Sequence, residues 1–221
     1  MKLLNIIIVI LITSSCAGYK PYINNNPFKN YGIKSISIPI FVNKSVLPAI
    51  SAKVTRSVVK VLFNYKNLKI YSGENYRADA FLIGIIESND KINNVFKPGG
   101  DKFADGDLKK SIGSRQSFFI PTNSSYSYNV KIYLIKDPSN NIIKLLKSKI
   151  PNNVKIKYPK LIFFKESTAT TAFDRQLKET TSVNSAGLVN FTQAQGNFYD
   201  SLDQSASSIA TQFNNAVTNE L

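Results

Sequence analysis

The order in which two hydrophobic periodicities occur is the feature that most limits the folds open to this chain. Apolar residues at every second position indicate a strand with one buried face, whereas apolar residues three and four apart indicate an amphipathic helix. The predicted order is strand, helix, strand, strand, strand, helix. These elements cover residues 36–42, 47–65, 81–86, 126–134, 142–150 and 196–221.

The first strand and the first helix each carry a proline whose position restricts the element. Pro39 cannot donate a hydrogen bond to a neighbouring strand, so the first strand is expected to lie at a sheet edge or to carry a bulge. Pro48 suits the first turn of the helix that follows. The strand residues expected on one buried face are Ile36, Ile38, Ile40 and Val42.

A sheet with one apolar face and two amphipathic helices bury each other most simply as two layers. We therefore predict an α+β fold, a two-layer sandwich in which a mixed sheet of about four strands carries both helices on one face. Residues 31–221 are expected to form a single domain, in which 142–150 pairs with the preceding strand as a hairpin. Two stretches fit no element and are treated as long insertions, residues 89–123 and 160–195.

Residues 1–15 have the parts of a secretory signal peptide. Lys2 follows Met1, a run from Leu3 to Ile12 is apolar apart from Asn5, and small residues lead up to Cys16. The apolar run is too short to span a bilayer, which takes about 20 residues. Residues 16–30, with two prolines and several asparagines, are then expected to form a tether.

Cys16 is the only cysteine, and it stands where a bacterial lipoprotein signal places its acylated cysteine. Two or three acyl chains such as palmitate would hold the protein at a membrane, at about 0.8 kcal/mol per buried methylene. Ala17, rather than Asp, follows the cysteine, which favours the periplasmic side of an outer membrane. The pattern departs from the usual one at Thr13, where Leu is common. An ordinary secretory signal followed by a stray cysteine is the alternative.

The residue types that are missing exclude several classes of enzyme. Without His and with a single Cys, the chain cannot build a Ser-His-Asp or Cys-His site and is poorly equipped to ligate zinc or haem. The acidic residues are scarce and form no recognisable acid–base pair. We therefore predict a protein that is not an enzyme and needs no cofactor or metal, with a secreted hydrolase as a rival interpretation.

The formal net charge of +14 restricts the partners. A strongly basic chain usually meets nucleic acid, an anionic membrane or an acidic ligand. Secretion removes nucleic acid, which leaves anionic lipid and, above all, lipopolysaccharide (LPS) with its phosphates and acidic sugars. The alternative is that the lysines form a solvated surface in a chain rich in Lys, Asn and Ile.

Several stretches together resemble the LptE family of LPS-assembly lipoproteins: CAGY, IKSISIPIFVNKS, the helix from Leu47 to Tyr65, ADAFLIGIIES, the hairpin and the closing helix. The insertions at 89–123 and 160–195 go beyond the compact family pattern. The resemblance implies an outer-membrane protein that sits as a plug inside the LptD β-barrel, helps it assemble, and binds LPS during delivery to the cell surface. No covalent chemistry is implied.

The residues predicted to carry this function are a lipidation site and a set of lysines. Cys16 would take the lipid. The lysines of the hairpin and its extension alternate with apolar residues and are candidates for LPS contact, although a solvated lysine face is the alternative for each. These lysines are Lys131, Lys147, Lys149, Lys155 and Lys157. Tyr126 and Tyr128 are expected in the core rather than at a sugar-stacking surface.

Two functions therefore remain open at the level of sequence. The first is an LPS-binding plug partnered by an LptD-like barrel and anchored to the outer membrane by its N-terminal lipid. The second is a periplasmic lipoprotein that binds an anionic ligand or the cell wall and has no barrel partner.

Overall fold

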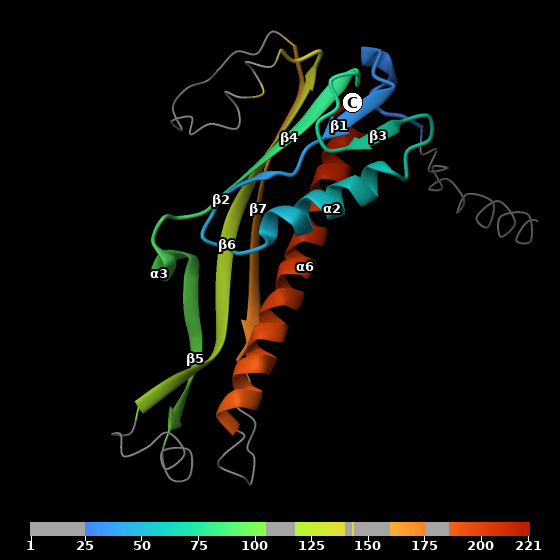
Figure 1. The fold of residues 1–221 in the computed structure, drawn as a ribbon. Helices are drawn as coiled ribbons and strands as arrows, with labels where there is room; N and C mark the ends of the chain where they lie inside the picture. Colours follow the sequence, from blue (N-terminus) through green and yellow to red (C-terminus); the bar gives the residue numbers. More distant parts are fainter. Residues whose placement is uncertain (1–24, 105–117, 140–142, 144–159, 176–185) are drawn as a thin grey trace, which may run out of the picture.

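The structure, a computed structural model, describes residues 25–104, 118–139, 143, 160–175 and 186–221 (Figure 1). A short 3-10 turn, η2 (Lys29–Tyr31), precedes the first strand. The strands are β1 (Ser35–Ile38), β2 (Val42–Lys44), β3 (Lys69–Ser72), β4 (Ala80–Glu87), β5 (Phe96–Ala104), β6 (Phe118–Lys136) and β7 (Leu161–Asp174). The helices are α2 (Ile50–Leu62), α3 (Ile92–Val95) and α6 (Ala186–Glu220).

Strand β6 is hydrogen-bonded to other strands along both of its edges, within one mixed sheet. Along one edge, residues 118–126 pair antiparallel with β5 and residues 129–136 pair antiparallel with β4. Its other edge pairs antiparallel with β7. Beyond β4, the short strands β1 and β2 pair with it in parallel, and β3 pairs in parallel with β1. The seven strands thus form a single sheet.

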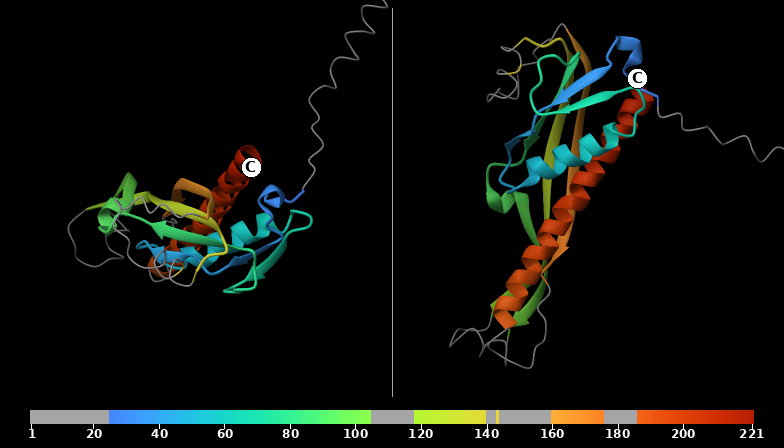
Figure 2. Two further views of the ribbon diagram at one scale, coloured as in Figure 1. Left: turned by 90° about the horizontal axis from the view of Figure 1, so that it is seen from above. Right: turned by 45° about the vertical axis from the view of Figure 1, so that its right-hand side comes forward.

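Both long helices lie on the same face of this sheet (Figures 1 and 2). On α2, a stripe at four-residue spacing is fully buried and consists of Ile50, Val54, Val58 and Leu62. The corresponding stripe on α6 consists of Leu202, Ala206, Ile209, Phe213 and Val217. Burial of each such side chain contributes about 1.5–3 kcal/mol of hydrophobic free energy, which explains why the two stripes meet over the sheet.

The lower part of the structure in Figure 1 is an arm of three strands and one helix. It consists of β5, the N-terminal part of β6, the C-terminal part of β7 and the N-terminal part of α6. Aromatic side chains fill its interior: the Phe198 ring lies 5.8 Å from Phe96, 5.7 Å from Tyr126 and 5.2 Å from Phe173, centre to centre. These separations are typical of favourable aromatic pairs.

The predicted fold class is confirmed, because an α+β sandwich with both long helices on one face is what the structure has. The expected number of strands, about four, is too small. Residues 89–123 were expected to form a loop, yet α3, β5 and the start of β6 lie there. Residues 160–195 contain β7 and the first turns of α6. The predicted domain boundaries remain predictions.

The hairpin expected between 126–134 and 142–150 is wrong. Strand β6 has β4 and β5 on one edge and β7 on the other, so neither edge is free for a further strand. Ile143, the one described residue within 142–150, is buried beside Phe81 and Ile135 on the sheet face that α2 and α6 leave uncovered. The partner of β6 therefore comes from a later segment than the sequence pattern indicated.

The first strand is broken at Pro39, and β1 is not an edge strand because β3 and β4 flank it. The alternation changes at this break. Ile40, expected on the buried face, is 68% exposed, whereas Phe41 is 2% exposed. The Phe41 ring lies directly over Gly84 of β4, where a side chain would overlap it. The glycine therefore provides the space into which Phe41 packs.

We expect Gly84→Ala to lower the free energy of unfolding by about 2 kcal/mol, since overpacking of a core usually costs about 1–3 kcal/mol. Urea denaturation measures this change. Adding Phe41→Leu should recover part of the loss, because the two sites are in contact and their effects are not additive.

The matched control is Gly196→Ala in α6, where an added methyl meets nothing within 4 Å. This variant should be neutral or more stable by up to about 1 kcal/mol, since Ala is the better helix former. Equal stability of the Gly84→Ala variant and the wild type would contradict the packing described here.

Candidate functional site

Most of the predicted site residues lie outside the described residues. This holds for Cys16 and for Lys147, Lys149, Lys155 and Lys157. The structure therefore leaves their predicted roles as predictions. Lys131 is the member of the set that the structure describes.

Lys131 lies on β6, on the face of the sheet that carries no long helix. Its ammonium donates to Glu87 Oε2 of β4 at 2.7 Å, and the two side chains are 20% and 25% exposed. The hydrogen bond from Lys131 to Glu87 is the main reason why the pKa of the lysine is raised. A phosphate that approached Lys131 would have to compete with this carboxylate.

The expectation that Tyr126 and Tyr128 belong to the core is confirmed. Their side chains are 1% and 2% exposed and point toward α6. The Tyr128 hydroxyl donates to Ser205 Oγ at 3.0 Å, and the Tyr126 hydroxyl lies 3.1 Å from Ser201 Oγ. These hydrogen bonds satisfy polar atoms that would be costly to bury alone.

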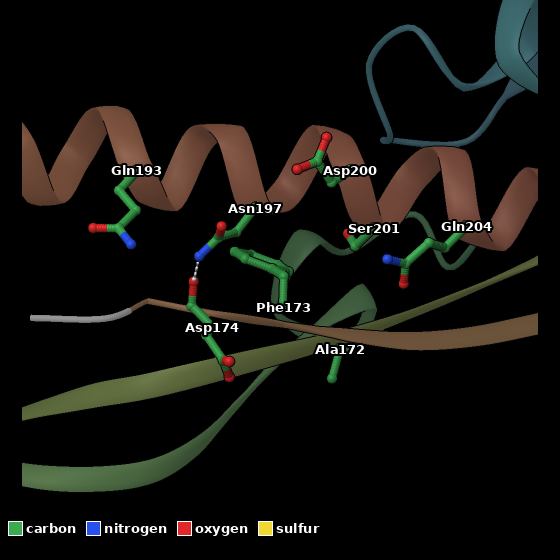
Figure 3. Close-up of a pocket in the computed structure, with 8 residues that line it drawn as sticks. All are labelled: Ala172, Phe173, Asp174, Gln193, Asn197, Asp200, Ser201 and Gln204. Atoms are coloured by element: carbon green, nitrogen blue, oxygen red, sulfur yellow. Dashed lines mark hydrogen bonds between the residues drawn. The ribbon is translucent and has the colours of Figure 1, made fainter.

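A hollow of about 290 Å³ lies between β7 and α6 in the arm (Figure 3). The Phe173 ring points from β7 toward the helix, whereas the Asp174 side chain points away from it. Asn197 donates from Nδ2 to the backbone oxygen of Asp174 at 2.9 Å and closes one side. The helix contributes Gln193, Asn197, Asp200, Ser201 and Gln204.

The chemistry of this hollow favours a neutral polar ligand. Amide side chains and the Asp200 carboxylate border an aromatic ring, an arrangement that offers hydrogen bonds to a polyhydroxylated molecule such as a sugar. None of its lining residues is cationic, so the hollow itself does not provide a phosphate site. Arg175 lies nearby, with its guanidinium carbon 5.8 Å from the centre of the Phe173 ring.

The described part of the chain contains neither a metal-ligand cluster nor a membrane-spanning helix. Within it, no three His, Cys, Asp or Glu side chains are grouped so that they could hold a metal ion. No helix among the described residues is both long and apolar enough to span a membrane.

No protein-family model matches this sequence, and no curated protein matches it. Solved structures with a similar arrangement include a presumed lipoprotein of Caulobacter crescentus, at 7% identity and a TM-score of 0.38, which covers 80% of this chain and 86% of the other. A minor lipoprotein of Acinetobacter baumannii aligns at 10% identity and a TM-score of 0.37, covering 85% and 92%.

A lipoprotein of Neisseria meningitidis is similar at 10% identity and a TM-score of 0.33, covering 75% of this chain and 97% of its own. At these TM-scores and identities, no property of these proteins is transferred to this chain.

The sequence pattern did not reveal the hollow, although part of its signal was present. Gln193, Asn197, Asp200 and Gln204 are spaced four, three and four residues apart, so a helix through them places all four on one side. The predicted helix began at residue 196, and β7 was not predicted. The sequence therefore predicted only part of the helix that lines the hollow and none of the strand.

Burial raises the pKa of Tyr128 from its usual value of 10.0 to about 12. Above pH 10 the unfolded chain loses this proton while the folded chain keeps it, so the unfolded state is favoured as the pH rises. We expect the free energy of unfolding to fall between pH 10 and about 12, with a share from Tyr128 on the order of 2 kcal/mol.

Denaturation of Tyr128→Phe over the same pH range tests this share. The free energy of unfolding of this variant should fall less with pH than that of the wild type. At pH 7 the variant should be less stable by about 1 kcal/mol, because Ser205 loses its hydrogen-bond donor. Tyr31→Phe, at an exposed tyrosine, is the matched control. Identical pH profiles for Tyr128→Phe and the wild type would contradict the assignment.

Proposed function

We propose that this chain is a non-enzymatic lipoprotein, anchored through Cys16 on the periplasmic side of an outer membrane, that binds LPS and supports the assembly of a β-barrel translocon. The observation that best supports this proposal is the fold. The two long helices and the strands on which the LptE resemblance rests, apart from the hairpin, lie in a two-layer sandwich in which one sheet face carries both long helices. Away from the buried contact of Ile143 with Phe81 and Ile135, the described residues leave the other face of the sheet open to a partner.

The arm has a surface that suits the lumen of a barrel. On the sheet face without the long helices, the outward side chains of β6 and β7 in the arm are mostly small and polar, with Lys97 of β5 beside Ser125. These side chains are Ser125, Ser127, Asn129, Thr168 and Thr170. Barrel interiors are polar, so a wedge with such a face would lose little hydration free energy on entering one.

LPS would be held by lysines rather than by the hollow. The hollow lacks a cation in its lining, and the ammonium of Lys131 is already paired with Glu87. Within this proposal, Lys147, Lys149, Lys155 and Lys157 would supply most of the phosphate contacts. Lysine contacts phosphate as a point charge, so such contacts would depend on the ionic strength.

The partner is tested by purifying the lipidated protein from detergent-solubilised outer membranes. We expect a large β-barrel protein to co-purify, and surface LPS to fall when the protein is depleted. The control is a Cys16→Ser variant, which should not reach the outer membrane and should capture less barrel. Recovery of the lipidated protein without any barrel would contradict the plug role.

Binding of LPS is tested separately with purified protein. The dissociation constant should rise about ten-fold or more between about 0.05 and 0.5 M NaCl, because exposed charge pairs are screened over about 10 Å at 0.1 M. A combined Lys147→Gln, Lys149→Gln, Lys155→Gln and Lys157→Gln variant should bind more weakly than one in which Lys131 alone is changed. Salt-independent binding would show that acyl-chain burial dominates.

The hollow favours a second candidate, a lipoprotein that binds a cell-wall sugar and has no barrel partner. Under this alternative, ligand-observed NMR would detect sugar binding that Gln204→Ala weakens, and membrane purification would return no barrel. A matched change outside the hollow is Thr211→Ala, on the exposed side of α6.

A further inference from the structure

One end of the sheet gathers the chain's first described residues and the ends of five strands. The registers Ser35↔Lys69, Ile36↔Ala80 and Ala80↔Lys136 place the start of β1, β3 and β4 beside the end of β6. The start of β7 joins them, since the backbone of Lys136 donates to Lys160 O at 3.0 Å. Asn25 forms a bridge with Lys66 at the same end. We call this surface the basic end; it lies at the top of Figure 1.

Six lysines lie at the basic end, five of them exposed and Lys136 half-buried. They are Lys29, Lys34, Lys66, Lys69, Lys136 and Lys160. They come from separate segments that are distant in the sequence. The ammonium of Lys136 donates to the backbone oxygen of Tyr31 at 2.9 Å, a contact that leaves its charge uncompensated.

The carboxylates at this end neutralise only part of that charge. Asp79 accepts hydrogen bonds from the backbone of Lys34 and from the backbone and hydroxyl of Ser35, at 2.8–2.9 Å, so neutral donors hold it. Asp137 is 3.8 Å from Lys160, and both side chains are more than half exposed. Glu220 pairs with a seventh lysine, Lys165, at 3.6 Å. The loop before β4 adds one charge of each sign, Glu74 and Arg77.

Among the described residues, the opposite part of the molecule has no such excess. Around the arm, the described exposed cations are balanced in number by carboxylates. The cations are Lys91, Lys97 and Arg175, and the carboxylates are Asp90, Asp174 and Asp200. The described charge is therefore distributed unequally along the long direction of the fold, with the positive pole at the end where the described chain begins.

The covalent chain links this pole to the proposed anchor. Eight residues lie between Cys16 and Asn25, and even a fully extended chain over those nine steps spans only about 30 Å. An acylated Cys16 would thus keep the basic end close to the headgroups. Tyr31, 38% exposed within η2, stands between Lys29 and Lys34, and tyrosine is enriched at membrane interfaces.

We propose that the basic end is a docking surface for anionic phospholipid headgroups, which turns the sheet end toward the bilayer and directs the arm away from it. The occupant is a lipid surface rather than a discrete ligand, because the lysines come from separate segments and are spread over one exposed end. The orientation rests on the proposed anchor at Cys16, whereas the affinity for anionic lipid does not.

The test uses the chain from Ala17 onward, which lacks the lipid but keeps every described element. Its sedimentation is measured with vesicles of phosphatidylcholine alone and with about 30% phosphatidylglycerol, where each lysine near the surface strengthens binding several-fold. We expect binding only to the anionic vesicles, lost as salt is raised. The combined variant Lys29→Gln, Lys66→Gln and Lys160→Gln should bind about ten-fold more weakly or worse.

The matched control removes the same charge elsewhere through Arg56→Gln, Lys91→Gln and Lys97→Gln, all at exposed positions. It should stay within about three-fold of the wild type, and circular dichroism melts should show that both variants fold. An equal loss in the two variants would mean that net charge alone drives binding and would overturn the proposal. So would equal binding of the wild type to neutral vesicles.

This outcome is separable from the proposed function. The sedimentation needs no acyl chain, barrel or LPS, whereas mass spectrometry of the membrane-derived protein reports on Cys16 and co-purification reports on the barrel. Binding to anionic vesicles with an unmodified Cys16 would preserve the surface and remove the anchor.

Discussion

Strand β6 is hydrogen-bonded along both edges, and this constraint places most of the described fold. Its two inward tyrosines, Tyr126 and Tyr128, lie two residues apart and bond to Ser201 and Ser205, which lie four residues apart on α6. Two residues of a strand advance about 6.7 Å, and four residues of a helix advance about 6 Å. Because these distances nearly match, the helix can run along the strand with its polar atoms satisfied and its apolar stripe buried.

The same arrangement separates two surfaces with different chemistry. The arm is neutral and polar on its uncovered face and carries a hollow whose lining has no cation. The basic end holds the surplus of lysines beside the first described residues. A protein fixed at one end to an anionic surface and free to present a polar wedge at the other is consistent with these features, and neither surface requires covalent chemistry.

The parts that sequence reasoning missed share a physical cause. Strand β5 contains Pro98, Gly99 and Gly100, which usually signal a turn, but it lies at an edge of the sheet, where such residues are tolerated. Strand β7 buries the small residues Ser167 and Ala169 beneath α6, so its alternation is hardly visible as hydrophobicity. In both strands the partner across the sheet decides the structure more than the local residues do.

Local hydrophobic periodicity was enough to predict three elements: α2, the doubly buried β4 and the second half of α6. The sequence by itself also determined the net charge, the lack of histidine and the placement of the single cysteine. Three features depend on tertiary contacts: the pairing of β7 with the second edge of β6, the hollow against α6, and the clustering of lysines at the basic end. Periodicity is a property of neighbours in the chain, whereas strand pairing and the local density of charge depend on which distant segments the fold brings together.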